Sequence, residues 1–272
     1  MESRRLKNII ILILALLNLC LLGSLAIRIN AEHASHRQAR EQLVALFSAA
    51  GVSLDAKLIS DETPPPSLTL IRDEAEEQTL AAYLLGGNPV RTDQGGGIFG
   101  YAEESGAAQF RSNGSFDVVC NRPLEDLRDY FQDFCDTFGY RDLTISMEDG
   151  TGTVTAVQVT AVQYYQDYPV IGCAVTFTVE NGVLKRAIGT HLPDSGTTSS
   201  SGEEPLSALS ALAAFLNTIR EGAVGTAVTD LYLCFELQST TTALMTLAPA
   251  WCVVTDTASY YVNCITGVVS LA

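Results

Sequence analysis

The chain has 272 residues, a formal net charge of −15 and 47% hydrophobic residues. This length fits one or two globular domains, and the apolar content is enough to form a core. An acidic chain lacks the basic surface that neutralises phosphates, which excludes nucleic acid as a partner. Because charged residues make up only 17% of the chain, a wholly disordered protein is also excluded.

The clearest single feature is the sequence IIILILALLNLCLLGSLAI at residues 9–27. It carries no charged side chain over 19 residues, about the length that a helix needs to cross a bilayer. Basic residues precede and follow it, so they do not decide its orientation. We expect a cytoplasmic tail over 1–8, a transmembrane helix over 9–29 and an extracytoplasmic body, because the opposite orientation exports only the short tail. The alternative is a signal peptide cleaved after Ala26.

Asn18 lies in the middle of this apolar segment. A side-chain amide inside lipid gains a hydrogen bond from a polar group on another helix. Asn18 is therefore a candidate contact with a partner helix, and Ala15 and Leu22 are assigned to the same contact. The alternative is a single amide that an otherwise adequate membrane helix tolerates.

The first part of the body, residues 30–120, begins with helical spacing of apolar side chains that ends near Gly51. The next segment, 52–60, has the composition of a strand. The three prolines that follow at 64–66 predict an extended connector. A helix is then expected over about 72–85, with acidic side chains near its positive N-terminal end. We expect these elements to form a membrane-proximal helix and a first αβ lobe.

Beyond residue 88 the sequence changes to short strands separated by tight turns. Asn-Gly or Asp-Gly pairs occur at 113–114, 149–150 and 181–182, and such pairs connect the strands of β-hairpins. Alternating Val and Thr at 153–165 predict a half-buried strand. The serine-rich stretch at 195–204 predicts a flexible linker.

A weak internal repeat organises the second part of the body, residues 121–272. A proline followed by a stripe of apolar residues predicts one helix from Pro123 and another from Pro205. Each helix precedes several strands, so this part is expected to hold two helix-plus-sheet units. The expected fold class is therefore α+β, with an N-terminal transmembrane helix and two αβ lobes whose antiparallel sheets are each covered by a helix.

No pattern for catalysis or for cofactor binding stands out. Residues 95–100 match G-x-G-x-x-G, but they lack the preceding apolar strand and the following helix of a dinucleotide site. His33, His36 and His191 have no neighbouring ligands that would complete a metal site. We expect no enzyme activity, no cofactor and no bound metal.

Six cysteines lie outside the apolar N-terminal segment, and none forms C-x-x-C. Cys252 and Cys264 belong to a closing stretch, residues 248–270, that reads as a strand hairpin. In an extracellular body the two thiols are a candidate disulfide. In the alternative they are small buried hydrophobic side chains. The hairpin itself is expected to serve in packing or in edge contact with another protein.

Three stretches resemble the membrane-anchored regulators of the YycI/YycH type and their PepSY-like αβ units. They are LKNIIILILALLNLCLLG at residues 6–23, DYPVIGCAVTFTVENGVLKRAIG at 167–189 and TLAPAWCVVTDTASYYVNCITGVV at 246–269. The resemblance implies one transmembrane helix, extracytoplasmic αβ lobes and no catalytic residues. The cysteine content departs from the pattern of such extracellular proteins.

The resemblance also implies a function. Such proteins regulate a cell-wall-related two-component sensor histidine kinase, through transmembrane-helix and extracytoplasmic contacts, together with a sister YycH-like regulator. The apolar segment 9–27 would then carry the kinase contact. An alternative function is a PepSY-like binding or inhibitory module for a peptidase or a cell-wall ligand.

Overall fold

The computed structural model describes residues 35–148, 156–194, 196–198, 204–219, 225–239 and 244–271. The expected transmembrane segment, with its candidate contacts Ala15, Asn18 and Leu22, lies outside these residues, as does the turn expected at 149–150. Among the helices in the described ranges, none combines the length and the apolar character needed to cross a bilayer.

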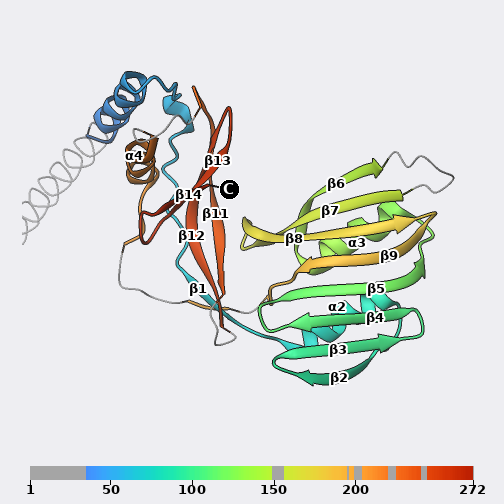
Figure 1. The fold of residues 1–272 in the computed structure, drawn as a ribbon. Helices are drawn as coiled ribbons and strands as arrows, with labels where there is room; N and C mark the ends of the chain where they lie inside the picture. Colours follow the sequence, from blue (N-terminus) through green and yellow to red (C-terminus); the bar gives the residue numbers. More distant parts are fainter. Residues whose placement is uncertain are drawn as a thin grey trace, which may run out of the picture.

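Fourteen strands form one mixed sheet, drawn in Figure 1. The strands of one region are β2 (Val90–Gly95), β3 (Ile98–Glu103), β4 (Gly106–Arg111), β5 (Ser115–Pro123), β6 (Tyr140–Glu148), β7 (Ala156–Tyr165), β8 (Tyr168–Glu180) and β9 (Val183–Thr190). The strands of the other are β1 (Leu68–Ile71), β10 (Gly196–Thr198), β11 (Val228–Ser239), β12 (Leu244–Thr255), β13 (Ser259–Asn263) and β14 (Val269–Leu271). The helices are residues 35–49, the 3-10 turn η1 (Ala56–Leu58), α2 (Glu74–Leu85), α3 (Leu127–Phe138) and α4 (Ala208–Ile219).

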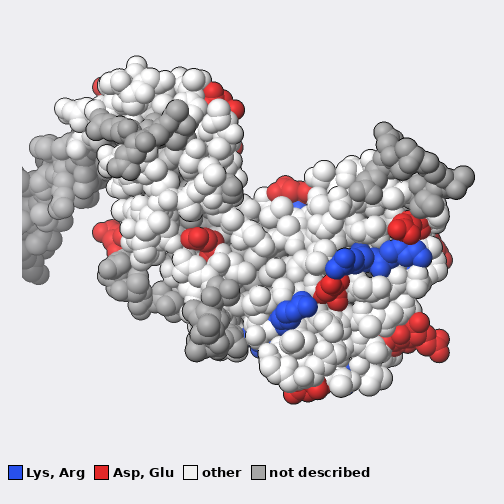
Figure 2. Space-filling view, in the orientation of Figure 1, with Lys and Arg blue, Asp and Glu red and all other residues white. Residues whose placement is uncertain are grey.

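We call β2–β9 with α2 and α3 the meander region, and β1 and β10–β14 with α4 and helix 35–49 the terminal region. In each region the helices lie against one face of the strands, behind the sheet of the meander region and beside β12 in the terminal region (Figure 1). The other face of each region is free of the described helices. In Figure 2 that face of the meander region carries basic and acidic side chains close together. Arg186 of β9 and Asp117 of β5 form an ion pair at 2.7 Å.

The expected fold class, two separate αβ lobes with antiparallel sheets, is wrong. One end of β8 pairs in parallel with β11, through Val170 opposite Phe235, whereas the rest of β8 pairs antiparallel with β9. This joint makes the protein a single β-rich, mixed sheet. Sequence periodicity reports which side chains are buried, but it does not report which strand edges meet, so the joint had no signal in the sequence.

Residues 120 and 121, where the two parts of the body were expected to divide, lie in β5. The residues on the N-terminal side of that division contribute to both regions. β1 lies between β10 and β12 in the terminal region, whereas β2–β5 continue the meander region beyond β9.

The helices of the meander region have clear sequence causes at both ends. Asp73 caps α2 by accepting from the backbone N–H groups of the first turn, and Gly86 ends the helix at a φ of 79°. Asp126 and Gly139 do the same for α3. The expected helix at 72–85 is thus confirmed within two residues. The helix expected from Pro123 starts only at Leu127, because Pro123 still belongs to β5 and pairs with Val183 of β9.

Local turn chemistry was predicted well where the chain is described. The pair Asn181 and Gly182, with φ values of 52° and 76°, connects β8 to β9 as expected. The glycine run 95–97 makes the turn from β2 to β3 and precedes no helix. The strand expected at 52–60 is wrong, because Asp55 caps the 3-10 turn η1 there.

The core has two main parts, one in each region. In the meander region, the rings of Phe131 and Phe134 on α3 lie 4.8 Å and 4.9 Å from that of Phe177 on β8. In the terminal region, Trp251 of β12 is fully buried in one cluster with Phe215 of α4. A third cluster lies between the two and contains side chains of β1, β7, β8, β11 and β12.

Candidate functional site

A cavity of about 690 Å³ lies where the meander and terminal regions meet. Strands β7 and β8 form one wall, strands β11 and β13 form the other, and Glu62 of the proline-rich connector adds to the rim. Along β7 and β8, buried residues that face the helices alternate with residues that face away from them. Val162 and Ala174, which line the cavity, are of the second kind. The cavity therefore opens on the side of the sheet that the helices leave uncovered. Its volume falls within the roughly 300–1,000 Å³ that is common for ligand pockets.

A bulge in β8 creates this cavity. Val162 of β7 pairs with Ala174 and Tyr164 pairs with Pro169, so that one residue of β7 faces residues 170–173 of β8. Such an excess of residues bends the strand. Gly172 takes a φ of 77° within the bulge, and a Cβ atom placed there would meet nothing within 4 Å. The bend carries β8 from its neighbours in the meander region to β11.

Tyrosine hydroxyls and carboxylates pair along the cavity. The hydroxyl of Tyr164 donates to Asp142 Oδ2 at 2.7 Å, and the hydroxyl of Tyr168 donates to Glu62 Oε1 at 2.8 Å. Burial and the bond to Asp142 raise the pKa of Tyr164 to about 12. The pKa of Tyr168 is raised chiefly by its bond to Glu62. Both phenols are therefore protonated donors at neutral pH.

A basic side chain already lies in this environment. Arg141 Nη2 donates to Asp167 Oδ1 at 2.6 Å, and its guanidinium lies 4.9 Å from the centre of the Tyr164 ring. Asp142 and Asp167 both have positive φ values, of 56° and 69°. Irregular backbone at a β-bulge and at a tight turn therefore places these carboxylates at the cavity.

The opposite wall is less polar. Tyr232, Cys234 and Tyr261 line it, and the thiol of Cys234 donates to the backbone oxygen of Ala250 at 3.3 Å. Burial raises the pKa of Cys234, and it raises the pKa of Cys173 in the other wall to about 12. Both thiols are protonated at neutral pH and add apolar surface to the lining of the cavity.

The structure does not bring together the two cysteines that the sequence marks as a candidate disulfide. Trp251 pairs with Val262 and Cys252 pairs with Tyr261 across β12 and β13. Cys264 lies on the same face of the sheet as Trp251 and packs in the core under α4. Cys252 lies on the opposite face, with Cys234. Both thiols are free and buried.

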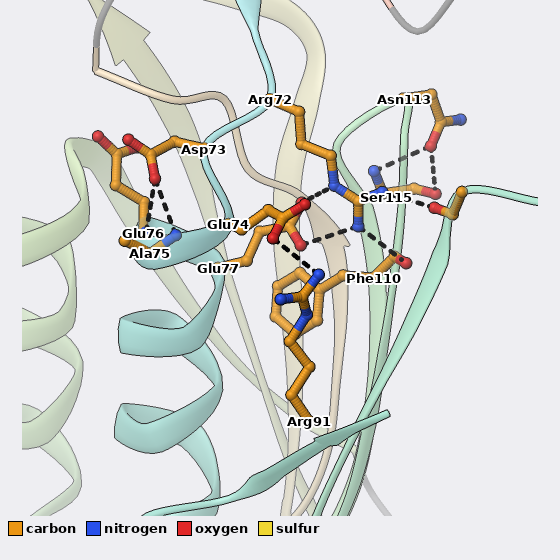
Figure 3. Close-up of polar contacts among 11 residues, drawn as sticks. Arg72, Asp73, Glu74, Ala75, Glu76, Glu77, Arg91, Phe110, Asn113 and Ser115 are labelled. Carbon is orange, nitrogen blue, oxygen red and sulfur yellow. Dashed lines mark hydrogen bonds and ion pairs between the residues drawn. The ribbon is translucent and has the colours of Figure 1, made fainter. Parts of the chain in front are cut away.

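A second polar cluster lies between α2 and β2–β4 (Figure 3). The guanidinium of Arg72 forms a two-fold contact with Glu77, at 2.5 and 2.8 Å, and also donates to the backbone oxygen of Gly97 at 2.6 Å. Burial nevertheless raises the pKa of Glu77. The Phe99 ring lies 4.2 Å from this guanidinium and 3.8 Å from that of Arg91. These partners are internal, so we interpret the cluster as structural.

His191 is buried at the end of β9. Its Nδ1 lies 3.3 Å from the side-chain nitrogen of Gln163, which also donates to the backbone oxygen of Leu192 at 3.0 Å. Burial lowers the pKa of His191 to about 4, so the imidazole is neutral at physiological pH. Within the described ranges, no group of three or more His, Cys, Asp or Glu side chains is arranged to hold a metal ion.

Sequence reasoning missed the residues of the cavity. The run QYYQDY at 163–168 holds Tyr164 and Tyr168. The β8 bulge and the tight turn before it direct both side chains into the cavity, and neither feature is visible in the sequence. Tyr232 and Tyr261 come from strands far along the chain. A search for tyrosines beside expected turns and acidic residues would have found Tyr164 and Tyr168 as candidates.

Comparisons with known proteins leave the function open. No protein-family model matches the chain, and no curated protein matches it. One similar solved structure is an uncharacterized protein from Eubacterium rectale ATCC 33656, with a TM-score of 0.47 and 11% sequence identity. The match covers 77% of this chain and 81% of that chain.

Proposed function

We propose that the chain is a non-enzymatic, membrane-anchored regulator that acts by binding a partner protein at the cavity between its two regions. The observation that carries this proposal is the lining of the cavity. Tyrosines such as Tyr232 and Tyr261 offer a rigid apolar ring with a polar tip, which suits them to binding surfaces. The buried thiols beside them are protonated and contribute shape only.

The partner that we propose is a cell-wall-related sensor histidine kinase, acting together with a sister YycH-like regulator. The uncharged segment at 9–27 supports an anchor beside a membrane kinase. Asn18, with Ala15 and Leu22, is the proposed contact between the two membrane helices. A regulator of this kind shifts the kinase between its states only if it binds them with different affinity.

Site-specific crosslinking of the full chain in its native membrane tests this function. A photoreactive phenylalanine at position 261 should crosslink to the kinase, because Tyr261 lines the cavity. The same probe at Gln109, an exposed residue of β4, is the matched control and should give no kinase adduct. Crosslinking that is equal at the two positions, or absent at both, would contradict the proposal.

The second candidate is a binding or inhibitory module for a peptidase or a cell-wall ligand. It is favoured because the cavity is built entirely from residues beyond the expected anchor. The two candidates differ in their need for that anchor. A chain that starts at residue 31 should lose kinase regulation in the first case, and it should retain inhibition or ligand binding in the second.

A further inference from the structure

We infer that the cavity binds an alkyl cation, the ammonium of a lysine or the guanidinium of an arginine, presented by the partner polypeptide. This inference rests on the proposed function and specifies the chemistry of the same site. It follows from three features of the cavity: its carboxylates, its tyrosine rings and its apolar wall.

The charged groups at the cavity have an acidic balance. Glu62, Asp142 and Asp167 line it, and the adjacent Arg141 pairs with Asp167. A carboxylate has two oxygens and accepts several hydrogen bonds. The single tyrosine bond to Asp142 and the one to Glu62 therefore leave capacity for an ammonium or guanidinium donor. An anionic ligand would instead meet like charges.

Arg141 shows how a cation fits here. Its guanidinium stacks at 4.9 Å from the Tyr164 ring centre while it donates to Asp167 at 2.6 Å. This pairing of an aromatic face with a carboxylate is the arrangement that recognises cations in proteins. The neighbouring pairs of tyrosine and carboxylate, Tyr164 with Asp142 and Tyr168 with Glu62, offer the same chemistry toward the cavity.

The other wall suits the stem of such a side chain. Tyr232, Cys234 and Tyr261 supply apolar surface across from the carboxylates. Lysine and arginine bury their methylene stems along apolar surface while the charged head keeps polar contacts. The net charge of −15 also raises the local concentration of cationic segments and speeds their association.

Calorimetric titration of the full chain in detergent micelles tests the inference. The probes are a tetralysine peptide, its tetraglutamate counterpart and n-butylammonium, which is the lysine side chain without a polypeptide. We expect tetralysine to bind, with an affinity that falls as NaCl is raised, and tetraglutamate not to bind. Equal binding of the two peptides would overturn the inference.

Two variants that remove one negative charge each locate the binding site. Asp142→Asn keeps an oxygen for the Tyr164 hydroxyl and should weaken tetralysine binding about tenfold, because it removes a charge-assisted bond. Asp93→Asn, on the distant strand β2, changes the net charge equally and keeps an acceptor for the N–H of Gly95. It should change binding by less than about twofold, because salt screens distant charges.

The remaining outcomes distinguish a cation on a polypeptide from a free alkylammonium, and the proposed function from the proposed cationic ligand. Equal weakening by both variants would overturn the inference, because binding would then follow net charge alone. Binding of n-butylammonium but not of tetralysine would overturn the assignment to a polypeptide. If Tyr261 crosslinks to the kinase and Asp142→Asn changes neither binding nor crosslinking, the proposed function stands and the cationic ligand is rejected.

Discussion

The meander region and the terminal region are both sheets with helices on one face, but their strands are connected differently. In the meander region most strands pair with a neighbour in the sequence, as in the series β2, β3, β4 and β5. In the terminal region, β1 pairs with β10 and with β12, far along the chain. The meander region is therefore assembled mainly from local contacts, whereas the terminal region adds the distant pairings of β1 to the local pairings of β11–β14.

Their cores differ in a matching way. Helix α3 covers the meander region with Phe131, Phe134 and Phe138, while α4 covers the terminal region with smaller side chains and Phe215. The β8 joint connects these unlike cores. Two cores joined through one strand can unfold separately or as one unit.

Phe177→Ala should give the largest effect. Phe177 is fully buried on β8 against two rings of α3, and removing such a side chain lowers the free energy of unfolding by about 3–5 kcal/mol. Trp251, the only tryptophan, lies in the terminal region, so its fluorescence reports that region alone. We expect the fluorescence and circular dichroism midpoints to fall together in a denaturant titration. A tryptophan midpoint that stays in place would show that the regions unfold independently.

His191 should make stability depend on pH. Its folded pKa of about 4 lies below the ordinary value of 6.5, so the unfolded chain binds the proton more readily between these values. The resulting stability is present above pH 6.5 and is lost as the pH falls toward 4, by about 3 kcal/mol in total. His191→Gln should flatten this part of the profile in denaturant titrations at several pH values. Parallel profiles for both proteins would refute the assignment.

The helix caps should give the smallest effects and a direct contrast between the regions. Asp126 accepts from two backbone N–H groups of α3, at 2.8 and 3.1 Å, and Asp126→Ala should reduce the free energy of unfolding by about 1 kcal/mol. Ser207 accepts from Ser210 at a longer 3.4 Å, and Ser207→Ala should reduce it by roughly half as much. Thermal unfolding of both variants measures the difference. A larger loss for Ser207→Ala would reverse the expected ranking.

Features with a local cause were the ones that the sequence predicted. Helix α2 follows from acidic residues after Asp73 and from Gly86 at its end, and the hairpin at Asn181 follows from residues that tolerate positive φ. Pro123 misled the prediction because a proline begins helices often, yet here it pairs with Val183 at the end of a strand.

The joint and the cavity depend on contacts that no local pattern encodes. Val170 and Phe235 meet in parallel across a long stretch of chain. The cavity then requires a bulge in β8 and a left-handed residue at Gly172. Glycine at that position is visible in the sequence, but its role appears only when both walls are in place. The sequence shows the tyrosines and carboxylates of the candidate site, but it does not predict that they line one cavity.

The position of β1 has a consequence for how the chain is made. Leu68–Ile71 lies between β10 and β12, and β12 starts only at Leu244. During synthesis, β1 emerges from the ribosome long before the strand that will flank it. The apolar side chains of Leu68 and Leu70 are both buried in the folded protein, and during synthesis they must wait for β12 to pair with β1. The nascent chain therefore keeps this apolar segment without its β12 partner until residues 244–255 have been made.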